Sequence, residues 1–127
     1  MASEPTMGII LLSGAHDRAH AAFSMAAAAA ALGRDVIMFG TGAGCRAFLA
    51  DWSSLRDVGR DAVIRRRGVA GFGELREATF ELGVRLLVCE SGLKAEALDG
   101  EKLAPGVEIA GMATLLEATF NGQIVSF

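Results

Sequence analysis

The apolar residues of this chain are gathered in five short runs of strand length. They cover residues 7–13, 35–39, 84–89, 107–110 and 123–127. The run at 7–13 offers no polar face to water, a pattern that is typical of a strand buried on both faces of a parallel sheet. We therefore expect five strands, with residues 7–13 forming a central one.

Helical patterns separate these runs. Residues 19–32 are rich in alanine and end at Gly33, with Asp17 as the expected cap, and residues 72–82 are amphipathic and end at Gly83. Shorter helices are expected at 45–50, at 90–98 and at 113–120. Strands that alternate with helices predict a three-layer α/β/α fold around a five-stranded parallel sheet. Residues 51–70 show no clean period and are interpreted as an excursion.

Length and composition favour one globular domain over residues 1–127, with residues 1–6 flexible. The apolar share of 52% and the mean hydropathy of +0.40 suggest buried strands and subunit contacts. No apolar run reaches the roughly 18 residues of a membrane span, and no signal sequence is evident. We therefore expect a cytoplasmic protein that does not enter a membrane.

The charge pattern argues against a nucleic-acid binder. The net charge is −3 and there is no basic tail, whereas such binders concentrate Lys and Arg to neutralise phosphates. The triplet Arg65, Arg66 and Arg67 is the exception. We interpret it as a solvated turn beside Gly68, with a local anion site as the alternative.

Ligands and reactive groups of an open parallel sheet gather beyond the carboxyl ends of its strands. This rule selects a short set of candidate residues, from the loops that follow the first four strands: Ser13, Gly14, His16, Gly42, Gly44, Cys45, Cys89, Ser91, Gly92, Gly111 and Thr114. The sequence does not indicate a cofactor or a metal site. His16 and His20 are four residues apart but have no evident third ligand, so His16 is interpreted as a polar group for a sulfur species or anion.

Cys89 is the strongest candidate for chemistry. It stands where a strand passes into a short helix, whose free N–H groups favour a thiolate. Lys94 would add attraction, Glu90 would oppose it, and an inert buried thiol is the alternative. In a reducing compartment both cysteines are expected to be free. Cys45 is expected to be a buried core thiol, and whether it meets Cys89 depends on the strand order.

The glycines at positions 40, 42 and 44 raise the alternative of a phosphate site. They follow the second strand in the spacing G-x-G-x-G, whereas the dinucleotide fingerprint is G-x-G-x-x-G after the first strand, and no Walker lysine accompanies them. The match is therefore weak.

Together these segments resemble the DsrE/DsrF-like proteins, small sulfur-relay and related proteins of which some are called TusD-like. The resemblance covers most of the chain and is carried by residues 8–13, 30–33, 36–39, 87–89, 106–111 and 124–127. It implies that Cys89 accepts a sulfane sulfur as a persulfide and passes it to a partner. It also implies a homotrimer, a homohexamer or a mixed hexamer, with a sulfur donor and an acceptor as protein partners.

Three hypotheses for the function follow. The leading one is a sulfur carrier of the sulfurtransferase type that works through Cys89. The second is a binding module without catalysis, in which the loops 14–16, 40–44 and 111–114 enclose a small anion or a nucleotide. The third is an oligomeric interaction protein without chemistry.

Overall fold

A computed structural model describes residues 5–127, and the predicted flexibility of residues 1–4 lies outside this range. The five expected strands are present and all pair in parallel, in the order β4-β3-β2-β1-β5. They are β1 (Met7–Leu11), β2 (Val36–Gly40), β3 (Arg85–Cys89), β4 (Val107–Ala110) and β5 (Ile124–Ser126). As expected, β1 is an interior strand, flanked by β2 and β5.

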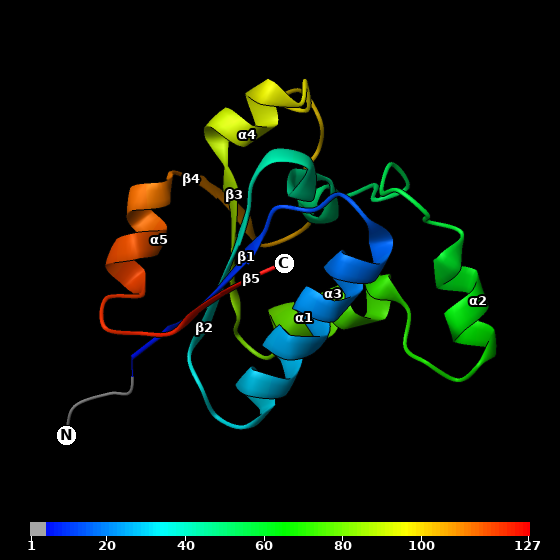
Figure 1. Ribbon diagram of the computed structural model, residues 1–127, viewed down its shortest axis with the longest axis horizontal. Coiled ribbons are helices and arrows are strands. Elements are labelled where there is room, and N and C mark those ends of the chain that lie inside the picture. The colour runs from blue at the N-terminus through cyan, green and yellow to red at the C-terminus, as the bar shows by residue number, and fades with distance from the viewer. Residues whose placement is uncertain (1–4) are drawn as a thin grey trace.

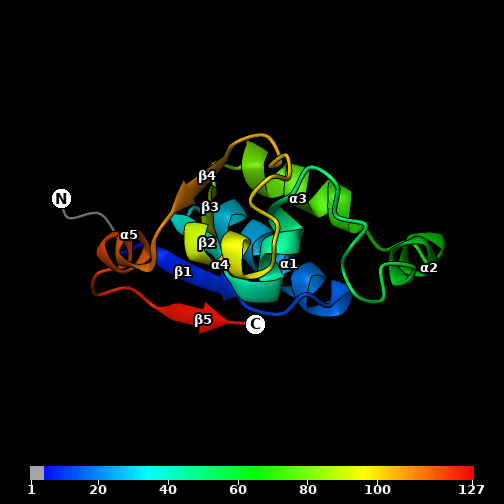
Figure 2. The ribbon, with the colours of Figure 1, turned by 90° about the horizontal axis from the view of Figure 1, so that it is seen from above.

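Helices cover both faces of the sheet, so the predicted α/β fold is confirmed. The pair α1 (His16–Ala31) and α3 (Phe72–Glu81) packs side by side on one face, and α5 (Met112–Ala118) lies on the other (Figures 1 and 2). The short helix α4 (Glu90–Ala95) and the 3₁₀ helix η1 (Gly42–Phe48) stand at the carboxyl edge of the sheet. No helix within residues 5–127 is both long and apolar enough to cross a membrane.

The alanines of α1 bring the helix close to the sheet. Ala19, Ala22 and Ala26 are fully buried beside Phe23, and Gly33 ends the helix in the left-handed region at φ +87°. The expectation that Asp17 caps α1 is wrong. The N-cap lies two residues earlier, at Ala15, so the helix begins at His16, and the Ala15 amide donates to Ser13 Oγ at 3.1 Å.

The excursion between β2 and α3 contains a helix that the sequence pattern did not reveal. Helix α2 (Arg60–Arg66) projects from the side of the molecule (Figure 1). The expected solvated turn at Arg65, Arg66 and Arg67 is therefore wrong in its backbone, because the first two belong to α2 and the third caps its end. The arginine side chains are nevertheless exposed. The sequence pattern did not predict this helix because a run of exposed arginines lacks the regular apolar spacing by which a helix is recognised.

The sheet divides the core into two unequal parts. The larger part packs β1, β2 and β3 against α1 and α3. The smaller part, between the sheet and α5, has five buried members: Ile37, Phe39, Leu87, Cys89 and Leu115. Cys89 therefore belongs to the α5 side of the sheet.

Candidate functional site

The sulfur of Cys89 is held by hydrogen-bond donors at the start of α4. Cys89 is the last residue of β3 and the N-cap of α4, and its Sγ accepts a hydrogen bond from the Gly92 amide at 3.4 Å. The hydroxyl of Ser91 lies 3.2 Å from the same sulfur. The chain turns from strand to helix at this residue, so the N–H groups that α4 cannot satisfy internally face the thiol.

These donors favour the charged form of Cys89. Burial acts to raise the pKa of the thiol, but hydrogen bonds from Ser91, Gly92 and Thr41 outweigh it and hold the pKa below its usual value. The residue keeps 7% of its surface exposed. Cys89 therefore combines a stabilised thiolate with a path to solvent, the two conditions for a reactive cysteine.

Thr41 is a site residue that the sequence analysis missed. It follows β2, which is the neighbour of β3 in the sheet, with Gly40 paired to Val88, so its side chain reaches Cys89 from the adjacent strand. Its hydroxyl lies in a loop that was selected for its glycines and Cys45. The strand order, which the sequence does not give, is the signal that would have identified it.

A hollow of about 390 Å³ opens beside Cys89. Its walls come from the loops after β2, β3 and β4, and its lining residues are Thr41, Cys89, Glu90, Ser91, Lys94, Gly111 and Met112. Glu90 and Lys94 form an exposed ion pair at 3.5 Å. The charges that were expected to act against each other on the thiol are thus paired with each other at the rim.

Cys45 lies on the other side of the β3 end, next to Gly92. A Cβ atom on residue 92 would lie 3.0 Å from Cys45 Sγ and 3.3 Å from Cys89 Cβ. Cys45 has no exposed surface, and its Sγ donates to the Gly40 carbonyl at 3.8 Å. Burial first, and then the nearby charges of Cys89 and Glu96, raise its pKa to about 11. The adjacency of β2 and β3 thus brings the two free thiols together.

The remaining predicted residues divide into two groups. Gly42 and Gly44 belong to η1, beside the hollow, and Gly111 lines it, whereas Thr114 lies further along α5. Ser13 and Gly14 belong to the turn before α1, where Gly14 packs against Ala43. No residue of the 14–16 loop lines this hollow, so the hollow does not join the three loops of the binding-module hypothesis.

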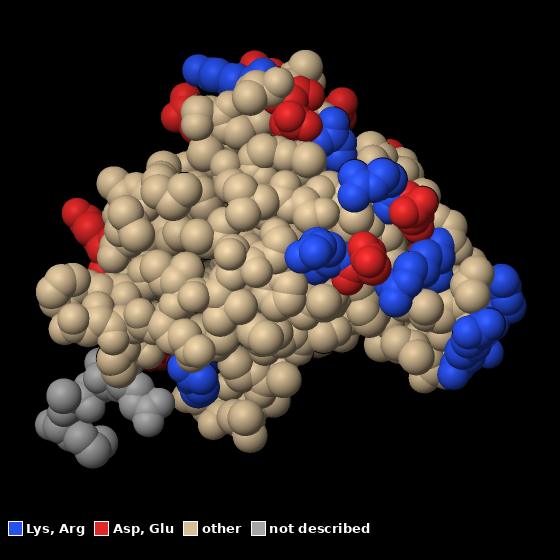
Figure 3. All heavy atoms as spheres, viewed as in Figure 1, with Lys and Arg blue, Asp and Glu red and all other residues tan. Residues whose placement is uncertain are grey.

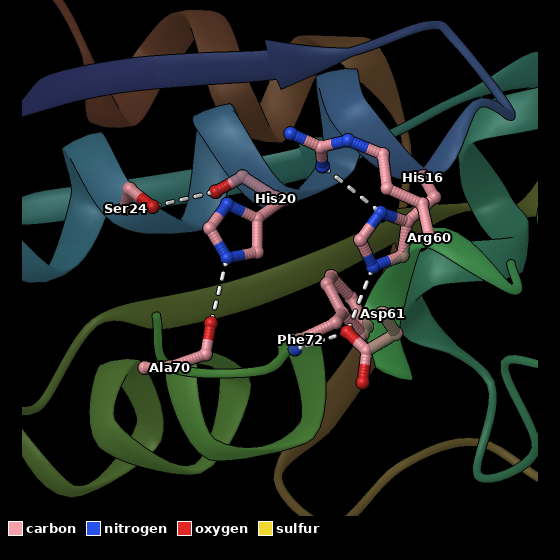
Figure 4. A network of polar contacts seen from close by, with 7 residues as sticks. All are labelled: His16, His20, Ser24, Arg60, Asp61, Ala70 and Phe72. Atoms are coloured by element: carbon pink, nitrogen blue, oxygen red, sulfur yellow. Dashed lines mark hydrogen bonds and ion pairs between the residues drawn. The ribbon is translucent and has the colours of Figure 1, made fainter. Parts of the chain in front are cut away.

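His16 is engaged away from Cys89. Its Nε2 lies 2.8 Å from a carboxylate oxygen of Asp61, and its Nδ1 lies 3.2 Å from the Arg60 guanidinium (Figure 4). Because a guanidinium only donates, Nδ1 accepts and Nε2 carries the proton that is donated to Asp61. The same carboxylate oxygen accepts from the Phe72 amide at 2.7 Å. His16 is fully buried, so its expected role toward a sulfur species has no geometric support.

Comparisons with known proteins agree with this architecture. A sequence model described as the DsrE/DsrF-like family matches residues 7–127. Among solved structures, the chain is similar to the YchN protein from E. coli, with a TM-score of 0.71 and 16% sequence identity. The match covers 96% of this chain and 99% of the YchN chain. At 16% sequence identity, the similarity to YchN shows a shared fold and nothing more. No curated protein sequence matches the chain.

Proposed function

Because the chain belongs to the DsrE/DsrF-like family, we propose that it is a sulfur carrier in which Cys89 accepts a sulfane sulfur as a persulfide and passes it to a partner. The family resemblance found in the sequence is confirmed, and sulfur relay is the general activity of the family. The finer assignment, to Cys89 of this chain, is the part that we propose.

One observation carries the proposal: the donors gathered on Cys89 Sγ. Ser91, Gly92 and Thr41 together stabilise a thiolate, and the thiolate is the form that attacks a sulfur atom. A persulfide carries its negative charge on the outer sulfur, one bond further out. The hollow of about 390 Å³ has room for that atom, and the hydroxyl groups of Thr41 and Ser91 line it.

The transfer balances without a cofactor. The Cys89 thiolate attacks the outer sulfur of a donor persulfide, a new S–S bond forms, the donor's S–S bond breaks, and the donor leaves as a thiolate. An acceptor thiolate then attacks the outer sulfur on Cys89 and regenerates the Cys89 thiolate. We include a cytoplasmic location in the proposal, because a reducing compartment keeps the thiol free between the two steps.

Self-association into a trimer or a hexamer is part of the proposal. Met112 and Leu116 in α5, and Phe120 just beyond its C-cap, are spaced four residues apart, and each exposes between 44% and 76% of its surface. We call these three residues the α5 stripe. Few charged side chains cover this part of the surface (Figure 3). An exposed apolar stripe of this kind favours contact with another protein surface, and its first residue, Met112, also lines the hollow beside Cys89.

Mass spectrometry after incubation with glutathione persulfide tests the proposal. The wild-type protein should gain one sulfur atom, and peptide mapping should place it on Cys89. A Cys89→Ser variant should gain none, while a Cys45→Ser variant, which keeps the reactive thiol, should gain it as the wild type does. Equal uptake by the wild type and Cys89→Ser, or no uptake by either, would refute the assignment.

A further inference from the structure

The two cysteines of the chain are separated by a residue without a side chain. Cys45 packs in the core under α1 and α3, and Cys89 packs on the α5 side. Gly92 lies between them, and the position that its missing Cβ would occupy is 3.0 Å from Cys45 Sγ and 3.3 Å from Cys89 Cβ. The backbone amide of Cys89 also hydrogen-bonds toward the Cys45 sulfur. No side chain of residue 92 obstructs the approach of one thiol to the other.

Cys45 is closed to molecules from outside. It has no exposed surface, and the side chains of Arg46 and Glu96 form an ion pair nearby. The groups whose charges act on it are Cys89, Glu96 and Arg46. A reaction of Cys45 in the folded protein must therefore be intramolecular, and Cys89 is the one other cysteine of the chain.

We propose that Cys45 is the resolving thiol of Cys89, which attacks the Sγ of persulfidated Cys89, forms a Cys45–Cys89 disulfide and releases hydrogen sulfide. This inference rests on the proposed function of Cys89. Cys45 approaches from the core side, whereas the outer sulfur lies in the hollow with Thr41 and Ser91. The inner sulfur is therefore the atom within its reach, once the Cys89 side chain turns about its Cα–Cβ bond toward Gly92.

The step balances without a further oxidant. A bond forms between the two Sγ atoms, and the bond between Cys89 Sγ and the outer sulfur breaks. The outer sulfur takes the electron pair of that bond, and the proton of the Cys45 thiol leaves with it as hydrogen sulfide. The outer sulfur is reduced and the Cys45 sulfur is oxidised, while the Cys89 sulfur keeps its oxidation level.

The environment of Cys45 makes this release of sulfide slow. With a pKa of about 11, Cys45 stays protonated at neutral pH, and a thiol is a much poorer nucleophile than a thiolate. A bound sulfur therefore persists long enough to be handed on. Without an acceptor, the loaded carrier slowly releases its sulfur as sulfide and forms the Cys45–Cys89 disulfide. A reductant must then reduce this disulfide before the next cycle.

The test follows the loaded protein over time. Wild-type protein, Cys45→Ser and Cys45→Ala are loaded with glutathione persulfide, freed of excess donor and kept without acceptor. Non-reducing mass spectrometry then measures the persulfide and the disulfide, and a sulfide-trapping reagent measures the sulfide released. In the wild type we expect loss of the persulfide to match the appearance of disulfide and sulfide. The decay is followed at several pH values between neutral pH and the pKa of Cys45.

Both Cys45 variants should keep the persulfide and form neither product at any pH in this range. Equal decay in the variants and the wild type, or a loaded wild type that never forms the disulfide, would overturn this inference and leave the sulfur carrier standing. A wild-type protein that takes up no sulfur on Cys89 would overturn both, and it is recognised at the loading step, before any decay is measured.

Discussion

The imidazole of His16 meets the carboxylate of Asp61 at 2.8 Å, although 45 residues separate them in the chain. His16 opens α1 and Asp61 belongs to the first turn of α2, and the same carboxylate oxygen holds the first amide of α3, from Phe72. Asp61 is the buried residue of α2. One carboxylate thus fastens the projecting helix to the two helices that cover the sheet.

Replacing this carboxylate should weaken the whole fold. Asp61→Asn keeps an acceptor oxygen for His16 and Phe72 but removes the charge that strengthens both hydrogen bonds, so we expect a loss of about 1–3 kcal/mol in the free energy of unfolding. Urea unfolding followed by circular dichroism measures it. Asp57→Asn is the matched control, because Asp57 is exposed and its left-handed backbone (φ 60°) suits asparagine. A loss no larger than that of the control would contradict the structural role.

The contribution of Asp61 should also disappear in acid. Burial acts to raise its pKa, but hydrogen bonds from Phe72 and His16, with the charge of Arg65, hold the pKa below the ordinary value of 3.8. The unfolded chain therefore binds the proton more readily. The stability that Asp61 adds is complete above pH 3.8 and is lost as the pH falls through the lower folded value. The difference in unfolding free energy between the wild type and Asp61→Asn should shrink over that window, and a constant difference would count against it.

Removing a donor from Cys89 should make its thiol less acidic. Ser91→Ala deletes the hydroxyl that lies 3.2 Å from the sulfur, so the pKa of Cys89 should rise toward its ordinary value. We expect alkylation by iodoacetamide at neutral pH to slow by about fivefold, which corresponds to a net hydrogen bond of about 1 kcal/mol. Ser54→Ala, in an exposed turn, should react as the wild type does. An unchanged rate in Ser91→Ala would show that its hydroxyl does not act on the thiolate.

The sequence pattern was sufficient to predict Cys89 as the candidate site because that inference is local. A buried run that ends in cysteine and passes into a helix places the thiol at the carboxyl edge whatever the strand order. The contacts of Thr41 and Cys45 with this site depend on β2 lying beside β3, and no local pattern encodes that adjacency. His16 was misjudged for the same reason, since its partner Asp61 lies in a segment without hydrophobic periodicity.

The α5 stripe should mediate self-association. Leu116→Glu places a charge in the middle of the stripe, where its burial between subunits would be costly, so the variant should dissociate into monomers. Sedimentation velocity measures the change. Leu32→Glu is the control, because Leu32 is 83% exposed at the end of α1, on the opposite face of the sheet. A wild-type protein that is already monomeric would show that the stripe is not a contact surface. An oligomer that persists in Leu116→Glu but is lost in Leu32→Glu would show the same.

The difference between the two thiols should be visible in simple labelling. Cys89 keeps some exposed surface and a lowered pKa, whereas Cys45 has no exposed surface and a pKa of about 11. At neutral pH only about one Cys45 thiol in ten thousand is ionised. An alkylating agent should therefore modify one cysteine of the folded protein, Cys89, and both after unfolding.

The rate of this labelling should also report the acidity of Cys89. As the pH rises, the rate should reach half of its maximum below pH 9.0, the ordinary pKa of a cysteine thiol, because the thiolate is the reacting form. Cys89→Ser should abolish the fast reaction and leave the folded protein unlabelled. Labelling of Cys45 at a comparable rate in the folded state would mean that the wall around it opens in solution. Cys45 would then be open to outside molecules, contrary to the enclosure from which its role as a resolving thiol is argued.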